Sequence, residues 1–455
     1  YEGKEEPKNV SAEDGEFYAT IDEALKANNN EVALGDGEFA LPSTLATDTT
    51  DGNTVVTISG NGIDKSTVKG SNNVNGNANH PGNYAHGLDL VFENLTYVTV
   101  NNGYQGGFGH AKSVTFRNCK IVGQFYCHSN APHYFYDCTI DPLTGYLYTY
   151  ASDCVFERCH FAASEGKALQ VYAEAAGTFT TRIINCTFKA AKQAATWDGL
   201  PVTGIDINSA HGAFMNVYVE ECTTEGFPVG LNSGSDLWNV KNGGKAYANL
   251  YIDGEPVWLA EYTLVDKAKY PSLFAKDGDY YVFGVEGLAS LNQYFKDNWC
   301  GNNTWTPKYN IAADINAEGF TWDGVWVNVG NNYNNGLVIN GNNHTISNLT
   351  INNFFLAGTP NGGDDTATPG EVKNITIDNA TVVGGSHDAA IFWGSCYGDV
   401  NFENVTVKNS KISGGSNVGA FVSRTTIENA ETVVNLKFTN CKVENCELSA
   451  DNLSA

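Results

Sequence analysis

Short alternations of apolar and polar residues recur along the first half of the chain. In each segment the alternation ends at a polar residue, and a small apolar residue and a second short run follow, as in Val114-Thr-Phe-Arg-Asn-Cys-Lys-Ile121. A period of two predicts strands with one set of side chains inward and the other outward. The polar position recurs at 94, 118, 137, 158, 185 and 221, in steps of 24, 19, 21, 27 and 36 residues. Such steps predict the coils of a parallel β-helix with loops of growing length.

A second series of the same kind follows, as in Thr345-Ile-Ser-Asn-Leu-Thr-Ile351 and Val400-Asn-Phe-Glu-Asn-Val-Thr-Val407. The shared asparagine falls at 348, 374, 404 and 440. Asparagine tolerates a left-handed turn, and stacked asparagine side chains can hydrogen-bond from coil to coil. We therefore expect a second stack of coils held by an asparagine column.

Each series begins with a short amphipathic segment. Residues 17–26 predict a helix with Thr20 at its N-cap, and residues 287–295 predict another. A stack of coils leaves an open apolar end, which a capping helix covers. Two caps therefore predict two tandem β-helices, over 1–262 and 286–455, with a linker or closing segment at 263–285.

The opening of the first half resembles a known superfamily. The segments Val32…Gly35-Asp-Gly-Glu-Phe39 and Thr57-Ile-Ser-Gly60 are similar to the N-terminal pattern of the pectin-lyase superfamily. The resemblance implies right-handed coils. The expected fold class is therefore all-β, with two tandem right-handed parallel β-helices, each with a short N-terminal capping helix.

Within that superfamily the nearest resemblance is to pectin methylesterases, over residues 15–225. Such enzymes use two aspartates, two glutamines and an arginine on the outer face of one sheet, where one carboxylate attacks the ester and the amides hold the oxyanion. The resemblance places Gln105 and Gln124 at the two glutamine positions.

The acidic part of that set is missing. Phe125 stands where the family has its first aspartate, and Gly145 or Tyr146 stands where it has the next. No arginine lies between Arg182 and Arg424. The resemblance thus implies an esterase-like scaffold without its nucleophile.

A second motif is similar to one in polygalacturonases. It is Thr203-Gly-Ile-Asp-Ile207, followed by His211, but Thr203 stands where those enzymes have a catalytic aspartate. The pair Asp364-Asp365 lies in a loop of the other half. Glycoside hydrolysis needs two carboxylates at a fixed separation, which these residues do not provide.

The second half resembles the asparagine-rich repeats of bacterial surface and adhesin-like proteins, through Asn340-Gly-Asn-Asn-His-Thr-Ile-Ser-Asn-Leu-Thr-Ile351. This resemblance implies an extracellular habitat more than a chemistry.

Charge narrows the range of partners. The 455 residues include 26 basic and 51 acidic ones, a net charge of −25. Such a surface repels phosphate backbones and polyuronates, which argues against nucleic acid and favours neutral glycans. No apolar run reaches the roughly 18 residues of a membrane span. The chain starts at Tyr1 and has one methionine, Met215, so we interpret it as a trimmed, exported product.

An aromatic stretch is the candidate ligand site. Residues about one coil apart in sequence lie about 4.8 Å apart in space, and aromatic faces with polar tips suit sugar rings. The candidate residues are Gln105, Gln124, Tyr126, His128, Tyr146, Tyr148 and Tyr172. The alternative is that half of these tyrosines belong to the core, since a shift of one residue inverts the faces.

Further predictions concern the burial of the cysteines, the exposure of two tryptophans and the binding of metal ions. The cysteines at 119, 138, 159, 186 and 222 predict an inward stack, whereas a disulfide between Cys127 and Cys154 is left open. The segments Trp197-Asp198-Gly199 and Trp322-Asp323-Gly324 predict turns with exposed aromatics. The eleven cysteines contain no CxxC pair, which argues against zinc. We expect no cofactor, although Ca²⁺ stays open without a recognisable calcium loop.

The sequence therefore favours an exported bacterial surface protein, a monomer, that binds polysaccharide or a surface partner without catalysis. The alternative is a carbohydrate-active enzyme, namely a polysaccharide lyase, pectinesterase or glycoside hydrolase, acting on a plant or host glycan. A third hypothesis, a structural spacer without a ligand, fits the second half.

Overall fold

The computed structural model describes residues 8–45, 54–70, 85, 87–99, 105–106, 108, 110–127, 131–143, 147–163, 168–173, 175–190, 196–197, 200–201, 204–209, 212–225, 247–298, 308–328, 336–360, 368–386, 388–426 and 433–451.

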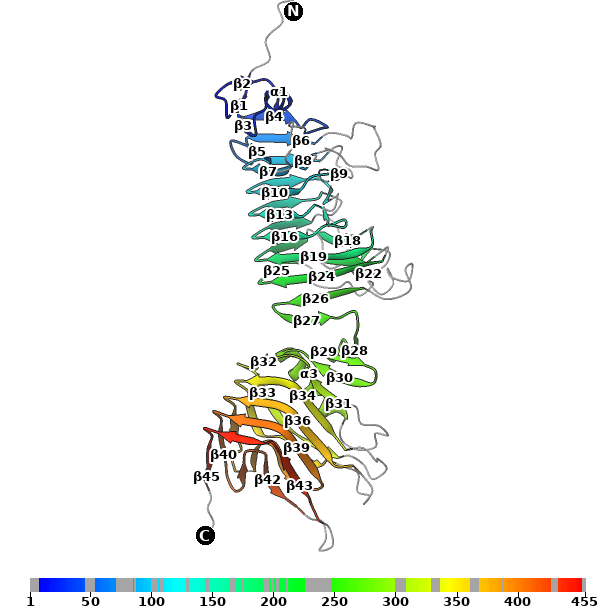
Figure 1. Cartoon of the computed structure of the whole chain (residues 1–455), viewed down its shortest axis with the longest axis vertical. Coiled ribbons are helices and arrows are strands. Elements are labelled where there is room, and N and C mark those ends of the chain that lie inside the picture. Colours follow the sequence, from blue (N-terminus) through cyan, green and yellow to red (C-terminus); the bar gives the residue numbers. More distant parts are fainter. Residues whose placement is uncertain are drawn as a thin grey trace, which may run out of the picture. The chain divides into compact units, whose positions relative to one another are not determined.

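The chain divides into two compact units, Tyr1–Ala260 and Glu261–Ala455. In each unit, parallel strands of successive coils lie side by side and form long sheets (Figure 1). The predicted fold class is confirmed, because both halves are built from stacks of parallel β coils. No described helix is long and apolar enough to span a membrane.

The first unit has three main sheets, called here the long, the second and the third sheet. The long sheet contains, in spatial order, β2 (Phe17–Tyr18), β1 (Val10–Ala12), β3 (Glu31–Leu34), β5 (Val55–Ser59), β7 (Asp89–Glu93), β10 (Ser113–Arg117), β13 (His133–Tyr136), β16 (Cys154–Glu157), β19 (Gly177–Ile184), β24 (Ala213–Glu220), β26 (Ala248–Ile252) and β27 (Glu255–Trp258). The second sheet contains β25 (Thr223–Glu225), β20 (Thr187–Ala190), β17 (His160–Ala163), β14 (Thr139–Asp141), β11 (Lys120–Val122), β8 (Thr96–Val98), β6 (Ser66–Lys69) and β4 (Gly37–Ala40). The third sheet contains β23 (Ile205–Ser209), β18 (Leu169–Ala173), β15 (Leu147–Tyr148), β12 (Phe125–Tyr126) and β9 (Gln105–Gly106), and a separate hairpin pairs β21 (Thr196–Trp197) with β22 (Leu200–Pro201).

The second unit has two sheets. The ten-stranded sheet contains β28 (Thr263–Asp266), β29 (Tyr270–Lys276), β30 (Asp279–Val282), β31 (Lys308–Ile311), β32 (Ile315–Asn316), β34 (Val338–Ser347), β36 (Gly370–Asp378), β39 (Val400–Lys408), β43 (Leu436–Thr439) and β44 (Lys442–Glu444). The eight-stranded sheet contains β33 (Thr321–Asn328), β35 (Thr350–Thr359), β37 (Thr381–Val383), β38 (Ala389–Cys396), β40 (Lys411–Gly414), β41 (Val418–Gly419), β42 (Val422–Thr425) and β45 (Glu447–Ala450). The stretch expected as a linker, 263–285, thus contributes the antiparallel strands β28, β29 and β30.

A helix lies at the start of each unit. In α1 (Ile21–Lys26), the Thr20 side chain accepts a hydrogen bond from the Glu23 amide at 3.1 Å, as expected of an N-cap. The second helix, α3 (Val285–Asn298), buries Leu288, Leu291 and Phe295 in the second core. The predicted capping helices are therefore present, although Phe17 and Tyr18 form strand β2 rather than the start of a helix.

The polar position that ends each run of the first series has a left-handed backbone. Its φ angle lies between 48° and 55° at Asn94, Asn118, Asp137, Arg158, Asn185 and Glu221. These residues turn the chain from the long sheet into the second sheet, as the repeat predicts. Where two asparagines meet, the Asn118 Nδ2 donates to the Asn94 Oδ1 at 2.8 Å.

Asparagines of the second unit form two ladders rather than one. In the first, Asn374 donates to Asn340 at 3.4 Å and accepts from Asn404 at 2.9 Å, and Asn440 donates to Asn404 at 3.2 Å. The predicted column at 348, 374, 404 and 440 is therefore wrong in one member. Asn348 belongs to the second ladder, which is described below. In its coil, the corner that Asn374 forms in the next coil is formed by other asparagines, among them Asn342 with φ 48°.

The second ladder runs beside the first. Asn348 donates to Asn316 at 2.8 Å and accepts from Asn379 at 2.7 Å. Its left-handed φ of 59° marks the next corner of the coil. Coil-to-coil hydrogen bonding between asparagines, expected from the sequence, is thus present at both corners.

We expect the substitution Asn374→Ala to lower the free energy of unfolding of the second unit by about 2 kcal/mol. Alanine loses one hydrogen bond to each neighbouring coil, and its Cβ opposes a φ of 54°. Asn374→Gly loses the same bonds but not the backbone conformation, so it should cost less. Urea denaturation of both variants checks the order, and a glycine variant as unstable as the alanine variant would contradict it.

The predicted cysteine column lies inside the first unit. Cys119, Cys138, Cys159 and Cys186 are buried, and Cys222 is half-buried. Each Sγ lies 3.4–3.5 Å from a backbone carbonyl oxygen of the preceding coil. Burial raises the pKa of the Cys119 thiol. The inward stack is confirmed, and Cys127 and Cys154, whose pairing was left open, are buried free thiols.

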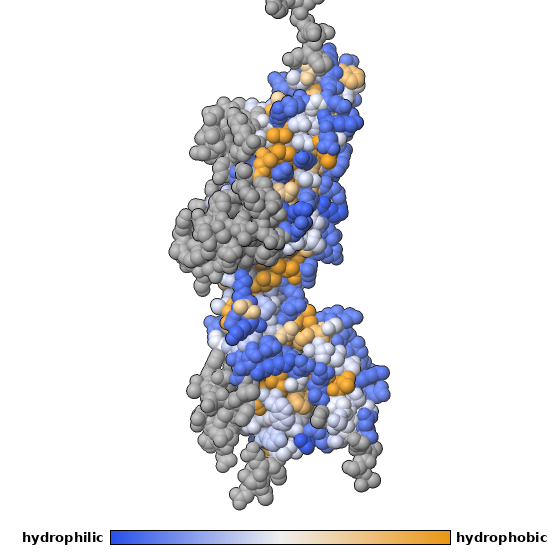
Figure 2. Space-filling model, turned by 180° about the vertical axis from the view of Figure 1, so that it is seen from behind, coloured by the Kyte–Doolittle hydropathy of each residue, from blue (hydrophilic) through white to orange (hydrophobic). Residues whose placement is uncertain are grey.

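Aromatic side chains fill both cores. In the first unit, Phe92, Phe116, Phe135 and Phe156 stack coil on coil with ring centroids 4.9, 5.4 and 4.7 Å apart. Outward residues are mostly polar, and the face in Figure 2 is largely hydrophilic with separate hydrophobic patches.

Trp322 belongs to the core of the second unit. Its ring stacks on Phe355 at 3.7 Å, and its Nε1 donates to the Phe355 carbonyl at 2.8 Å. The prediction of an exposed turn at Trp322 is therefore wrong, because the residue lies in strand β33 and is 0 % exposed. The Trp197 side chain lies outside the described residues.

Candidate functional site

The third sheet of the first unit alternates between a core face and an outer face. One row across its strands, formed by Phe125, Leu147, Leu169 and Ile205, is fully buried in the core. The neighbouring row therefore faces outward, since successive side chains of a strand point to opposite faces. The strand register aligns this outer row as Tyr126, Tyr148, Gln170 and Asp206.

Four tyrosines meet on this outer face. The Tyr126 ring lies 4.6 Å from that of Tyr148 and 5.6 Å from that of Tyr150. The Tyr172 ring lies 5.9 Å from Tyr148 and 6.2 Å from Tyr150, so the four rings close a square. Tyr148 is buried beneath the group, whereas the other three are half-buried. We call Tyr126, Tyr148, Tyr150 and Tyr172 the tyrosine platform.

The turn after β15 fixes the position of two platform residues. Tyr150 and Ala151 have φ angles of 38° and 59°, an uncommon conformation outside glycine. The buried Thr149 hydroxyl donates to the Tyr172 carbonyl at 3.1 Å and accepts from the Tyr172 amide at 3.0 Å. These two bonds tie the turn to β18, which carries Tyr172, and so hold the rings in register.

A buried polar pair continues the outer row. The Gln170 Nε2 donates to the Asp206 Oδ2 at 3.0 Å, and these side chains are 2 % and 1 % exposed. A buried carboxylate needs such donors to offset its lost hydration. The pair lies next to Tyr148 in the register, so one edge of the platform has polar groups.

The structure brings together three of the candidate residues, Tyr126, Tyr148 and Tyr172. Gln124 is 8 % exposed and lies before β12, and Gln105 pairs through its backbone with Phe125, while its side chain lies outside the described residues. His128 and Tyr146 also lie outside the described residues.

Tyr150 and the Gln170–Asp206 pair were missed as site residues. A signal for the pair is present in the sequence, because 170 and 206 are separated by the same 36 residues as positions 185 and 221 of the coil repeat. The placement of Tyr150 depends on its left-handed turn, which a period-two pattern does not predict.

The position that the esterase resemblance assigns to an aspartate faces the core. The Phe125 ring is 0 % exposed and meets Tyr97 and Phe116 edge-on at 6.0 and 5.7 Å. Within the described strands of the third sheet, Asp206 is the one acidic residue. No second carboxylate of these strands faces Asp206 across the platform. Thr203, which stands at the aspartate position of the glycosidase motif, lies outside the described residues.

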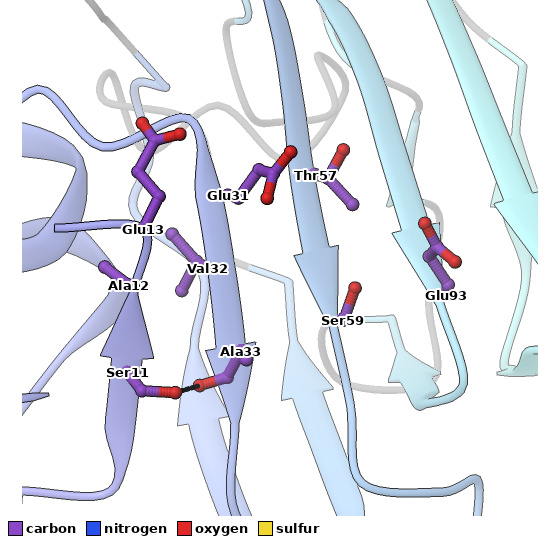
Figure 3. A pocket seen from close by; sticks show the side chains of 9 residues that line it. All are labelled: Ser11, Ala12, Glu13, Glu31, Val32, Ala33, Thr57, Ser59 and Glu93. Carbon is purple, nitrogen blue, oxygen red and sulfur yellow. Dashed lines mark hydrogen bonds between the residues drawn. The ribbon is translucent and has the colours of Figure 1, made fainter. Parts of the chain in front are cut away.

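A separate open cavity of about 410 Å³ lies on the outer face of the long sheet near its start. Figure 3 shows the carboxylates of Glu13, Glu31 and Glu93, which come from three different segments of the chain. The Glu13 carboxylate accepts a hydrogen bond from the Asn30 amide at 2.6 Å. The lining contains no aromatic and no basic side chain, so it offers a sugar ring no stacking surface.

Metal ligands are not clustered in the part of the chain that the structure describes, since no three His, Cys, Asp or Glu side chains there could hold one ion together. The Ca²⁺ site that the sequence left open stays a prediction.

Comparisons with known proteins give weak likenesses. No family model matches the chain, and no curated protein matches it. The catalytic domain of a GH87 alpha-1,3-glucanase in complex with tetrasaccharides aligns with 93 % of this chain and 67 % of its own, at 14 % identity and a TM-score of 0.20. The A-module of the Azotobacter vinelandii mannuronan C-5 epimerase AlgE6 aligns with 94 % of this chain and 93 % of its own, at 11 % identity and a TM-score of 0.18. At these TM-scores neither likeness bears on what this chain does.

Proposed function

We propose that the first unit binds a neutral polysaccharide at the tyrosine platform without turning it over, as part of an exported, monomeric surface protein. The observation that carries the proposal is the square of four tyrosine rings on an outer face, three of them half-buried. Outward positions of a β coil are mostly polar, so four adjacent tyrosine rings on one outer face support a role in ligand binding.

Tyrosine rings suit a sugar better than an apolar ligand. The C–H face of a pyranose packs on an aromatic ring, while hydroxyl groups at the edge exchange hydrogen bonds with polar side chains. The tyrosines of the platform offer both through their rings and hydroxyl groups, while the buried Gln170–Asp206 pair continues the row that contains Tyr148.

The charge of the protein favours a neutral chain over a polyuronate. With 51 acidic against 26 basic residues, an acidic polysaccharide would meet repulsion that only bridging cations offset. No basic residue lies in the described strands of the third sheet. A neutral glycan avoids this repulsion.

The small number of acidic residues in the described third-sheet strands supports binding without turnover. Hydrolysis of a glycosidic bond uses two carboxylates, and ester cleavage by this scaffold uses two aspartates. Asp206 is the one acidic residue in the described third-sheet strands, and its Oδ2 accepts a hydrogen bond from Gln170. For the rival hypothesis, an enzyme acting on a plant or host glycan with catalytic groups on different coils, Asp206 is the acidic candidate within these strands.

We expect Tyr172→Ala to weaken binding of a neutral polysaccharide about tenfold, which is typical of losing one well-placed aromatic contact. Tyr172→Phe should keep most of the affinity because it keeps the ring. Affinity electrophoresis in gels with xyloglucan, galactomannan or mixed-linkage glucan measures the change, and a pectin gel provides the acidic comparison. A matched control is Tyr251→Ala, from the Tyr218–Tyr251 pair that stacks at 5.1 Å on the long sheet.

Mass spectrometry of the same polysaccharides after incubation tests the absence of turnover. Unchanged chains are expected. New fragments or demethylated products that disappear in Asp206→Asn would establish the enzyme instead. Equal mobility of the parent protein and of Tyr172→Ala in every gel would favour the third hypothesis, a structural spacer without a ligand.

A further inference from the structure

The second unit has its own cavity, of about 520 Å³, on the outer face of its eight-stranded sheet. Its lining includes Trp326 and Phe354, called here the aromatic wall, and Asp388, Ser395, Asn417 and Arg424, called here the polar wall. The volume lies within the range of about 300–1,000 Å³ of pockets that hold small ligands. We call this cavity the Trp326 pocket.

Trp326 is exposed for a structural reason. The pairing register of β33 with β35 shifts between Asp323 and Val325, where two steps along β33 match four steps along β35. With strict alternation Trp326 would face the core as Trp322 does, but the alternation changes at this register shift. Val325 and Val327 are buried, so Trp326 between them faces outward. A Cβ at Gly324 would lie 2.9 Å from the Phe354 carbonyl oxygen, which explains glycine at the register shift.

The aromatic wall is preorganised. Trp326 is 55 % exposed, and its ring meets Phe354 at 6.1 Å, edge-on, and Tyr397 at 6.3 Å. Phe354 lies directly over the backbone of Gly394, where an added Cβ would come within 2.3 Å of the ring. The wall thus presents a large indole face whose neighbours are fixed by the sheet.

The polar wall is a connected network centred on Asp388. Its carboxylate, 12 % exposed, accepts from Asn417 Nδ2 at 2.7 Å, Ser395 Oγ at 3.0 Å and Arg424 Nε at 2.8 Å. The Arg424 Nε also lies 2.9 Å from the Ser395 Oγ. Both of these guanidinium contacts within the described part of the chain use Nε.

We propose that the Trp326 pocket is a second binding site for a neutral glycan, independent of the tyrosine platform. The indole face takes a sugar ring, and the network supplies donors from Arg424 and Asn417 for hydroxyl groups. Because the Asp388–Arg424 pair is formally neutral, the pocket carries no net charge that would select an acidic sugar. The second unit then acts as a binding module rather than as a spacer alone.

The test is a titration of the full chain with neutral hexasaccharides of glucose, mannose and xylose, followed by calorimetry and tryptophan fluorescence. We expect Trp326→Ala to lose the fluorescence change and to weaken binding at this site about tenfold or more. Trp326→Phe should keep part of the affinity, and Asp388→Asn should weaken binding because it releases Arg424 from its ionic partner.

The stoichiometry separates this site from the platform. If the Trp326 pocket and the tyrosine platform bind the same hexasaccharide, the parent protein binds two molecules of it. Trp326→Ala and Tyr172→Ala then each bind one molecule, and the double variant binds none. Binding that Trp326→Ala leaves unchanged, or the absence of a saturable response to any probe in the parent, would overturn the second site. Binding that is lost in Trp326→Ala but unchanged in Tyr172→Ala would support the second site and reject the platform.

Discussion

The substitution Trp322→Ala is expected to lower the free energy of unfolding of the second unit by about 3–5 kcal/mol, the usual cost of truncating a buried large aromatic side chain. Trp322 is 0 % exposed, stacks on Phe355 at 3.7 Å and donates to a backbone carbonyl. The variant loses this contact area, opens a cavity and leaves the Phe355 carbonyl without its donor.

Trp326→Ala provides the matched control, because the same residue type lies four positions later in the same strand. Its side chain is 55 % exposed, so its removal should change stability by about 0.5 kcal/mol or less. Urea denaturation followed by far-ultraviolet circular dichroism compares the two. Similar losses of stability in both variants would contradict the assignment of Trp322 to the core and of Trp326 to the surface.

Phe135→Ala is the second large expected effect, about 3–5 kcal/mol in the first unit. Its ring lies parallel between Phe116 at 5.4 Å and Phe156 at 4.7 Å, so the variant interrupts the stack on both sides. Phe135→Leu keeps most of the volume and should cost less than about 1.5 kcal/mol.

Thermal unfolding by calorimetry measures this loss and also tests the division of the chain. Phe135→Ala should lower the transition of the first unit and leave that of the second in place, while Trp322→Ala should do the reverse. A single transition that both variants lower equally would mean that the two compact units unfold together.

Most of the fold could be predicted from the sequence because each coil repeats its chemistry. Asn118 and Asp137 could be assigned to turns because a polar residue there always precedes a small buried one, and Cys138 could be assigned to the core for the same reason. Such a pattern depends only on the local alternation of polar and apolar residues, which can be read directly from the sequence. The two asparagine ladders were merged because Asn348 and Asn374 have similar neighbours but occupy different corners.

The sites were less predictable, because they arise where the repeat is broken. Trp326 reaches the surface through a register shift between β33 and β35, and Tyr150 joins the platform through a left-handed turn. A prediction of inward and outward faces from strict alternation assumes that neither a register shift nor a left-handed turn interrupts the strand. The Phe125 position shows the same limit, since the resemblance assigns an outward aspartate to it, while the Phe125 side chain faces the core.

The asparagine ladders also bear on how such a protein can change during evolution. Each interior rung, such as Asn374 or Asn404, donates to the coil before it and accepts from the coil after it, and successive rungs are 34, 30 and 36 residues apart. A duplicated segment of one whole coil would bring its own asparagine and join the ladder on both sides, because each coil contacts only its neighbours. Gene duplication can therefore lengthen the second unit in whole coils, whereas a partial insertion within the strands of one coil would break the rungs that this coil makes with its neighbours.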